Sequence, residues 1–241
     1  MIGGHSILGS GWATDLARTD VEVDGTRITL FESERVVVLH RHGIDTYTPA
    51  HRIDHVAHLR ALVDAGCDRV LAVSSVGSMR PEWGVGTFVA PDDFVALDTT
   101  ISVHHDLRSH VVPGFDREWR GQLVQAANRV GEIVVAGEVA FDGRPVIDGG
   151  VYWQSTGPRF ETRAEIRFIA RFADLVGMTV ASEAVVALEL AVPYAAVCVV
   201  DNLANGVAEA PLSVEEFEAG KRATRTSVLA FLDALVPVLA T

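Results

Sequence analysis

The chain contains 241 residues, of which 49% are hydrophobic and 22% charged, so it can bury a large core, and we expect a single domain over residues 1–241. Its formal net charge of −12 argues against a nucleic-acid partner, because binding to a phosphate backbone depends on clustered Lys and Arg. Cys67 and Cys198 lie in apolar surroundings and the sequence opens without a basic-then-apolar leader, so we expect neither disulfides nor export, and a cytoplasmic location follows.

Apolar runs of strand length alternate with amphipathic segments of helix length along the chain. The runs are rich in β-branched residues and several are continuous, which is typical of strands buried on both faces. This alternation predicts an α/β fold with a central, mostly parallel (mixed) sheet flanked by helices, in which ligands bind where strands end at their carboxyl side. The expected strands are 36–40, 69–76, 87–89, 133–141, 151–154 and 194–200, and the expected helices are 51–65, 116–130, 162–172, 182–190 and 213–235.

The longest apolar tract, residues 184–200, does not predict a membrane span. It contains Glu189 and Pro193 and falls short of the roughly 20 clean apolar residues that a span requires. It indicates a helix followed by a buried strand. The last helix has a clear start, because Ser213 with Glu216 three places on matches a capping box.

Three candidate anion-binding positions lie in the first third of the chain. Residues 3–6 (Gly-Gly-His-Ser) form a turn in which backbone N–H groups and the Ser6 hydroxyl could approach an anion, although tight turns also favour glycine without any ligand. Arg41 and His42 directly follow a strand; Arg41 offers a planar fork of donors to phosphate or pairs with a neighbouring carboxylate. Ser74 ends a buried strand and can donate to phosphate or cap the next turn.

The most informative motif lies further on, in three separate loops. Residues 157–165 (Gly-Pro-Arg-Phe-Glu-Thr-Arg-Ala-Glu) are followed by 177–179 (Gly-Met-Thr) and by 201–206 (Asp-Asn-Leu-Ala-Asn-Gly). Together they supply an aromatic ring, an acid, a thioether and an amide, a set of groups that can bind a purine nucleoside.

Each of these side chains also has a purely structural interpretation. Met178 and Phe160 are core residues by default, because flexible thioethers and aromatic rings fill apolar gaps. Glu161 suits the start of a helix for dipole reasons, and Asn202 suits a turn. Their occurrence in one order along the chain favours the binding interpretation.

In that order, these residues resemble the trimeric purine nucleoside phosphorylase and methylthioadenosine phosphorylase family over nearly the whole chain. The most specific matches are the Gly-Pro-Arg-Phe-Glu-Thr block and the Gly-Met-Thr block with Glu183 after it, and residues 49–55 resemble the family's Pro-His-x-Ile-Asn-Tyr helix start. Where the family's glycine loop has Gly-Gly-Ser/Thr-Gly, this chain continues with residues 5–7 (His-Ser-Ile), and Thr46 or Tyr47 stands near the place of a sugar-contacting histidine.

The resemblance implies phosphorolysis: inorganic phosphate attacks C1′ of a purine nucleoside and yields free base and a pentose 1-phosphate, with no metal or organic cofactor. Catalysis would fall to Asn202, Arg41 and His42. Phosphate would be bound by Ser6, Arg41, His42, Ser74 and Thr179, the sugar by Met178, and the base by Phe160, Glu161 and Asn202.

The base-reading residues favour a 6-oxopurine nucleoside such as inosine, guanosine or 5′-methylthioinosine. The Asn202 amide can donate to N7, and the Glu161 carboxylate can accept from a purine N1–H. Adenine-directed members of the family have aspartates where this chain has Asn202 and Ala204. A 5′-methylthioadenosine phosphorylase is the alternative within the family. Two alternatives from other classes are a phosphate-independent purine nucleosidase and a non-catalytic nucleoside-binding protein.

Histidines occur in two further places where they could serve a site. His51, His55 and His58 share one helix face at metal-ligand spacing, but without a nearby cysteine or clearly positioned acid we expect no metal. His110 resembles the position from which trimeric members lend a histidine to the neighbouring subunit's pocket, which implies a homotrimer.

Overall fold

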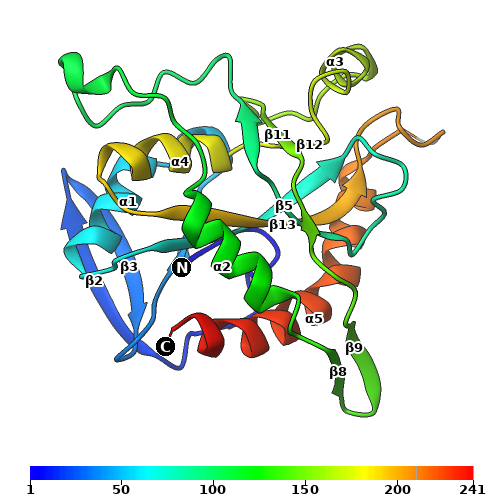
Figure 1. Ribbon diagram of the computed structural model, residues 1–241, viewed down its shortest axis with the longest axis horizontal. Coiled ribbons are helices and arrows are strands. Elements are labelled where there is room, and N and C mark those ends of the chain that lie inside the picture. Colours follow the sequence, from blue (N-terminus) through cyan, green and yellow to red (C-terminus); the bar gives the residue numbers. More distant parts are fainter. Residues whose placement is uncertain (210, 241) are drawn as a thin grey trace.

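One mixed sheet runs through the middle of the molecule with helices on both faces, which confirms the expected α/β class (Figure 1). The structure is a computed structural model and describes residues 1–209 and 211–240. Within these residues the sheet has eleven strands; its main path is β10-β6-β13-β5-β1-β4-β3-β2, and β12 joins β11 and β7 to β5. The strands are β1 (Ile2–Gly3), β2 (Ala17–Val23), β3 (Thr26–Glu32), β4 (Val37–His40), β5 (Val70–Ser78), β6 (Phe88–Ala90), β7 (Asp93–Val95), β10 (Ile147–Asp148), β11 (Val151–Gln154), β12 (Leu175–Gly177) and β13 (Tyr194–Leu203).

Two long parallel strands, β5 and β13, form the centre of the sheet. They pair from Val70 opposite Tyr194 onward, and β5 pairs on its other edge with β1. Successive side chains of a strand point to opposite faces, so Val70 and Ala72 belong to one apolar cluster while Leu71 and Val73 belong to another. Both faces are therefore covered, as the continuous apolar sequence predicted.

Each face of the sheet carries its own pair of helices (Figure 1). α1 and α4 pack on the Val70 face, α2 and α5 pack on the Leu71 face, and α3 packs on a smaller cluster beside β12. None of the described helices, α5 included, has the length and apolar character that crossing a membrane requires. The helices are α1 (His55–Asp64), α2 (Arg117–Ala127), α3 (Arg163–Ile169), α4 (Val180–Glu189) and α5 (Val214–Leu239), with short 3-10 turns η1 (Ala50–Arg52) and η2 (Leu107–Ser109).

Polar side chains begin several of the helices. Ser213 accepts the N–H of Glu216 at the start of α5, as expected, and Thr162 forms a reciprocal capping box with Glu165 at the start of α3. The helix expected over 51–65 begins later, at His55, because the preceding Asp54 accepts the N–H of Ala57 and η1 forms a separate turn.

Two β-hairpins differ from the sequence-based expectation. β2 and β3 were not expected, because their exposed edge is rich in charged residues and lacks a continuous apolar run. The single strand expected over 133–141 is a hairpin of β8 (Glu132–Val135) and β9 (Glu138–Asp142). Ala136 and Gly137 both have positive φ, 52° and 85°, which is the geometry of a tight two-residue hairpin turn.

Close contact between α5 and β13 gives a test of the fold. A Cβ atom on Gly220 of α5 would lie 1.8 Å from the carbonyl oxygen of Asp201, so Gly220→Ala must push the helix from the sheet. We expect it to lower the free energy of unfolding by about 1–3 kcal/mol in urea titrations. Gly121→Ala in α2 is the matched control, since no described atom outside its own helix lies within 4 Å of the added methyl group. Gly121→Ala should raise the free energy of unfolding by up to about 1 kcal/mol. Equal effects of the two substitutions would contradict the close contact between α5 and β13.

Candidate active site

A cavity lies at the carboxyl ends of β4, β5 and β13 and beside the loop after β12. The sheet places it there because parallel strands end at a common edge, where connecting loops leave room for a ligand. All of the predicted site residues except Ser6 and His110 line it: Arg41, His42, Ser74, Phe160, Glu161, Met178, Thr179 and Asn202.

Strand β5 forms the floor of the cavity and sets its length. At one end, a Cβ atom on Gly4 would lie 2.4 Å from Nη1 of Arg41 and 3.5 Å from Cα of Ser74, so these three residues are immediate neighbours and only glycine fits at position 4. At the other end, a Cβ atom on Gly77 would lie 3.3 Å from Nδ2 of Asn202. Three residues of extended chain span about 10 Å. We refer to the two ends of the cavity as the Ser74 end and the Asn202 end.

Arg41 is fixed at the Ser74 end by a buried ion pair with Glu183 of α4. Its Nε and Nη2 donate to the two carboxylate oxygens over 2.5 and 2.9 Å, and its Nη1 donates to the carbonyl of Val73 over 3.0 Å. Tyr194 donates its hydroxyl to the same carboxylate over 2.7 Å. Burial alone would raise the pKa of Glu183, but the charge of Arg41 outweighs it and holds that pKa well below its usual range.

Two imidazole rings lie next to Arg41. The rings of His5 and His42 have centroids 3.8 Å apart, and Nε2 of His5 lies 3.1 Å from the hydroxyl of Tyr47. Burial, followed by the positive charge of Lys221 and Arg41, lowers the pKa of His5 to about 4. Burial, followed by the neighbouring His5 and Arg41, lowers the pKa of His42 to about 3. Both rings are therefore neutral near pH 7.

The Asn202 end carries groups that suit a flat heterocycle. Asn202 is buried, and one N–H of its amide donates to the carbonyl of Leu203 over 2.9 Å, which leaves the second N–H available. Phe160 packs edge-to-face with Phe217 of α5 at a centroid distance of 5.3 Å. The Asn205 side chain donates to the main-chain carbonyl of Glu161 over 2.9 Å and so ties that loop to the end of β13.

Met178 lies between the loops that form the two ends. Its sulfur would be 2.7 Å from a Cβ atom on Gly157, whose φ of +64° favours glycine independently. β12 runs antiparallel to β5, so the chain leaving Gly177 returns toward Ser74 and starts α4 after Thr179. The N–H of Thr179 is held by the Tyr152 hydroxyl at 3.2 Å.

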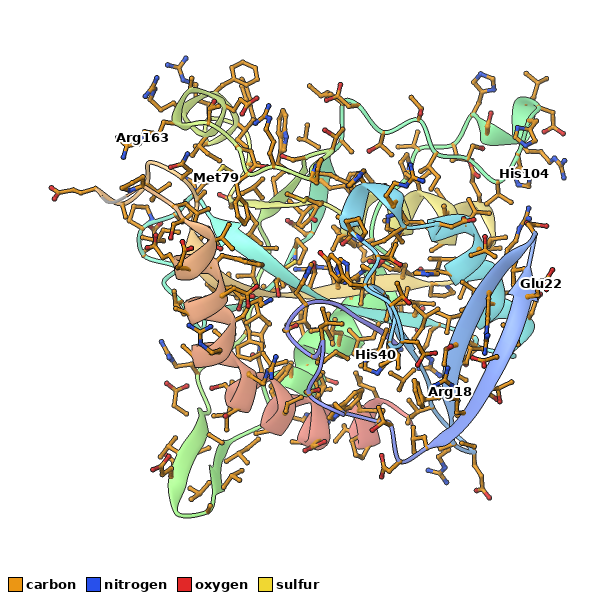
Figure 2. All side chains as sticks on the ribbon, turned by 180° about the vertical axis from the view of Figure 1, so that it is seen from behind. Arg18, Glu22, His40, Met79, His104 and Arg163 are labelled. Atoms are coloured by element: carbon orange, nitrogen blue, oxygen red, sulfur yellow. The ribbon has the colours of Figure 1, made fainter. Side chains whose placement is uncertain are left out.

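Ser6 and His110 are the two predicted residues that are not among the described residues lining the cavity. Ser6 is buried and its hydroxyl has no hydrogen-bond partner in the described structure, whereas the preceding His5 faces the cavity. His110 is exposed on the segment around η2, which reaches out beyond α4 in Figure 1. Figure 2 shows His104 of the same segment at the edge of the molecule, well apart from His40, which precedes Arg41.

Some site residues were not assigned a role from the sequence. Glu183 was noted only as part of the family pattern, and its pairing with Arg41 joins positions 142 residues apart. Leu212 and Phe217 also line the cavity, but an apolar residue at the start of a helix carries no signal of its own. Only the folded structure brings them to the site.

The three histidines considered as metal ligands are separated by their environments. His51 is exposed, whereas His55 and His58 point into the protein, where burial lowers the pKa of His58 to about 4. Across residues 1–209 and 211–240, no cluster of His, Cys, Asp or Glu side chains could hold a metal ion.

Comparison with known proteins gives consistent matches. A family model described as "Phosphorylase superfamily" matches residues 11–237. The chain is 37% identical over 220 residues to a probable 6-oxopurine nucleoside phosphorylase of Archaeoglobus fulgidus, covering 90% of this chain and 86% of that one. It is 35% identical over 193 residues to a probable S-methyl-5′-thioinosine phosphorylase of Methanosarcina acetivorans, covering 78% and 69%. A solved structure of methylthioadenosine phosphorylase from Schistosoma mansoni in complex with adenine superposes with a TM-score of 0.81 at 24% identity, covering 100% and 91%; at that identity it shows the fold alone.

The Arg41–Glu183 pair yields a stability prediction. Glu183→Gln leaves a buried guanidinium without its counter-charge, and we expect a loss of about 3–5 kcal/mol in the free energy of unfolding at pH 7. The pKa of Glu183 is lower in the folded protein than in the unfolded chain, where it is about 4.3. The stabilisation is therefore complete above that pH and is lost as the pH falls below it.

Urea unfolding between about pH 3 and pH 7 checks this prediction. The Glu183→Gln protein should be less stable at neutral pH, and its stability should fall less steeply in acid than that of the wild type. Glu34→Gln, at an exposed position, is the control and should follow the wild type throughout. If both variants behave alike, the pair does not stabilise this end of the cavity.

Proposed function

This chain belongs to the phosphorylase superfamily, and from that premise we propose that it cleaves 6-oxopurine nucleosides by phosphorolysis to free base and pentose 1-phosphate. The observation that carries the proposal is the cavity along β5, with anion-binding groups at the Ser74 end and base-reading groups at the Asn202 end. We assign phosphate to Arg41, His42, Ser74 and Thr179, the sugar to Met178, and the base to Phe160, Glu161 and Asn202; Ser6 stays a prediction outside the cavity lining.

The chemistry explains why the two ends differ. Breaking the glycosidic bond builds positive charge on the sugar and negative charge on the leaving purine, so a site must hold an anion beside C1′ and donate a hydrogen bond to the base. Arg41 and His42 position the phosphate for attack. The free N–H of Asn202 donates to N7 as charge develops there, and Glu161 accepts from N1–H.

The names of the relatives support a 6-oxopurine. The Archaeoglobus fulgidus relative is named for 6-oxopurine nucleosides and the Methanosarcina acetivorans relative for S-methyl-5′-thioinosine. A carboxylate acceptor at Glu161 and an amide at Asn202 match that base type. Ala204 stands where adenine-directed members carry an acid, so 5′-methylthioadenosine is the less favoured substrate. The proposal covers a 5′-hydroxyl or a 5′-methylthio group on the sugar.

We also propose an oligomeric state, a cellular location and a cofactor requirement for this enzyme. A homotrimer is supported by exposed apolar residues around His110, with Leu107 82% and Val112 94% exposed. In such a trimer His110 would contribute to the neighbouring subunit's cavity. We propose that the enzyme works in the cytoplasm with phosphate as its co-substrate and with neither a metal nor an organic cofactor.

The direct test is base release from inosine, 5′-methylthioinosine, adenosine and 5′-methylthioadenosine, each with and without phosphate. We expect hypoxanthine to be released only when phosphate is present, because phosphate is the nucleophile that we assign to the Ser74 end beside Arg41. Equal release without phosphate would identify a nucleosidase instead. No release from any of the four would favour a binding protein.

Asn202→Asp tests the assignment of the base-reading end. A carboxylate at this position no longer donates to N7 of hypoxanthine, whereas it can accept from the 6-amino group or from a protonated N7 of adenine. We expect the ratio of kcat/KM for adenosine to that for inosine to rise at least about tenfold. Asn128→Asp is the matched control, since its side chain only accepts the N–H of Val146 far from the cavity. An unchanged ratio in the Asn202→Asp protein would remove Asn202 from base recognition.

A further inference from the structure

The two cations that act on His5 at the Ser74 end, Arg41 and Lys221, are each paired with a carboxylate. The charge of Arg41 is already matched by Glu183 in the buried pair. Lys221 of α5, the next cation, donates to Glu218 over 2.8 Å. A doubly charged anion entering this end would therefore find the charges of Arg41 and Lys221 already matched, and leaving water for such a site costs free energy unless its charge is compensated.

The hydrogen bond made by His42 fixes where its proton lies. Nδ1 of His42 is 2.9 Å from the main-chain carbonyl of Thr48, and a carbonyl can only accept, so Nδ1 carries the hydrogen. In the neutral ring Nε2 then bears a lone pair. That nitrogen repels an anion oxygen unless it gains a proton and becomes a donor.

His5 occupies the place in the glycine turn where the family has a hydroxyl residue. Its ring faces the cavity and packs 3.8 Å from the ring of His42, with Tyr47 hydrogen-bonded at its Nε2. We propose that His5 completes the anion site and that the His5–His42 pair binds one proton together with the anion. This inference rests on the proposed function, because it treats phosphate as the ligand of the Ser74 end.

The surroundings explain why one proton, and not two, accompanies the anion. Titratable and charged groups face the pair from each neighbouring element: Arg41 after β4, Tyr47 in the following loop, Glu183 of α4, and Lys221 of α5. Two imidazolium rings in contact would repel each other and Arg41, so the pair titrates as one unit. One proton bound by either ring turns the pair into a donor and adds one positive charge at the Ser74 end.

The same contacts keep the pair neutral when the site is free. Burial and nearby positive charge hold the pKa of both rings far below 7, so the proton comes from solvent as the anion binds and returns to solvent when it leaves. The anion therefore binds more weakly as the pH rises. A hydroxyl residue at position 5 would donate without any such dependence.

Sulfate is the probe for this inference, because its charge is constant across the accessible pH range whereas phosphate itself titrates near neutrality. Titration calorimetry of the wild-type protein in two buffers with different ionisation enthalpies gives the number of protons bound with each sulfate. We expect about one at pH 6.5, together with a dissociation constant that rises about tenfold per unit between about pH 5 and pH 7. Zero proton uptake, or a dissociation constant independent of pH, would overturn the proposal.

Two variants locate the proton. The double variant His5→Ser, His42→Gln keeps neutral donors at both positions and should bind sulfate with no proton uptake. If the wild type takes up a proton and the double variant folds but no longer binds sulfate, the result also supports the two histidines as ligands of the anion. His105→Gln, an exposed histidine, is the control and should behave as the wild type. Unchanged proton uptake in the double variant would place the proton on another group and overturn the proposal.

Failure of this inference is distinguishable from failure of the proposed function. If hypoxanthine release depends on phosphate but sulfate binding takes up no proton, the proposed phosphorolysis stands and the proposed role of the histidine pair is wrong. If sulfate binding takes up a proton but base release is equal with and without phosphate, the proposed anion site stands and the proposed phosphorolysis is wrong.

Discussion

The buried ion pair between Arg41 and Glu183 is the interaction on which the cavity depends. It connects the end of β4 to α4, and through Tyr194 it also reaches the start of β13. Removing either charge would leave the other one buried without a partner, so the pair fixes the Arg41 guanidinium in one orientation. The same ion pair means that the negative charge of Glu183 neutralises the positive charge of Arg41. In the proposed site, an anion at the Ser74 end would gain its compensating charge from the adjacent pair of His5 and His42.

The parallel pairing of β5 with β13 is the second constraint, because it sets the distance between the two ends of the cavity. Ser74 and Gly77 are three residues apart on one rigid strand, and Asn202 lies beside Gly77 through the pairing of the two strands. The sheet therefore fixes the positions of the two ends, while Phe160 and Met178 reach the cavity from loops. These loops are themselves held in place: Asn205 donates to the main-chain carbonyl of Glu161, and Gly157 accommodates the sulfur of Met178.

Much of this architecture could be predicted from the sequence, for identifiable physical reasons. Continuous apolar runs predict β5 and β13 because only strands buried on both faces tolerate them. The charged β2–β3 hairpin carries no such run and was missed. The residues predicted at strand ends do line one cavity, and their roles there stay predictions. The sequence could not show which of His5 and Ser6 faces that cavity, since the geometry of one turn decides it. Nor could it show that Glu183 neutralises Arg41, because that contact joins distant segments.

The most direct measurement of the central claim is a crystal structure of the protein with hypoxanthine and sulfate bound together. We expect the sulfate within hydrogen-bonding distance of Arg41 and Thr179, and the base against Phe160 with its N7 facing the amide of Asn202. We also expect an imidazole nitrogen of His5 or His42 to contact the sulfate. A sulfate bound away from Arg41, or a base bound outside this cavity, would contradict the account.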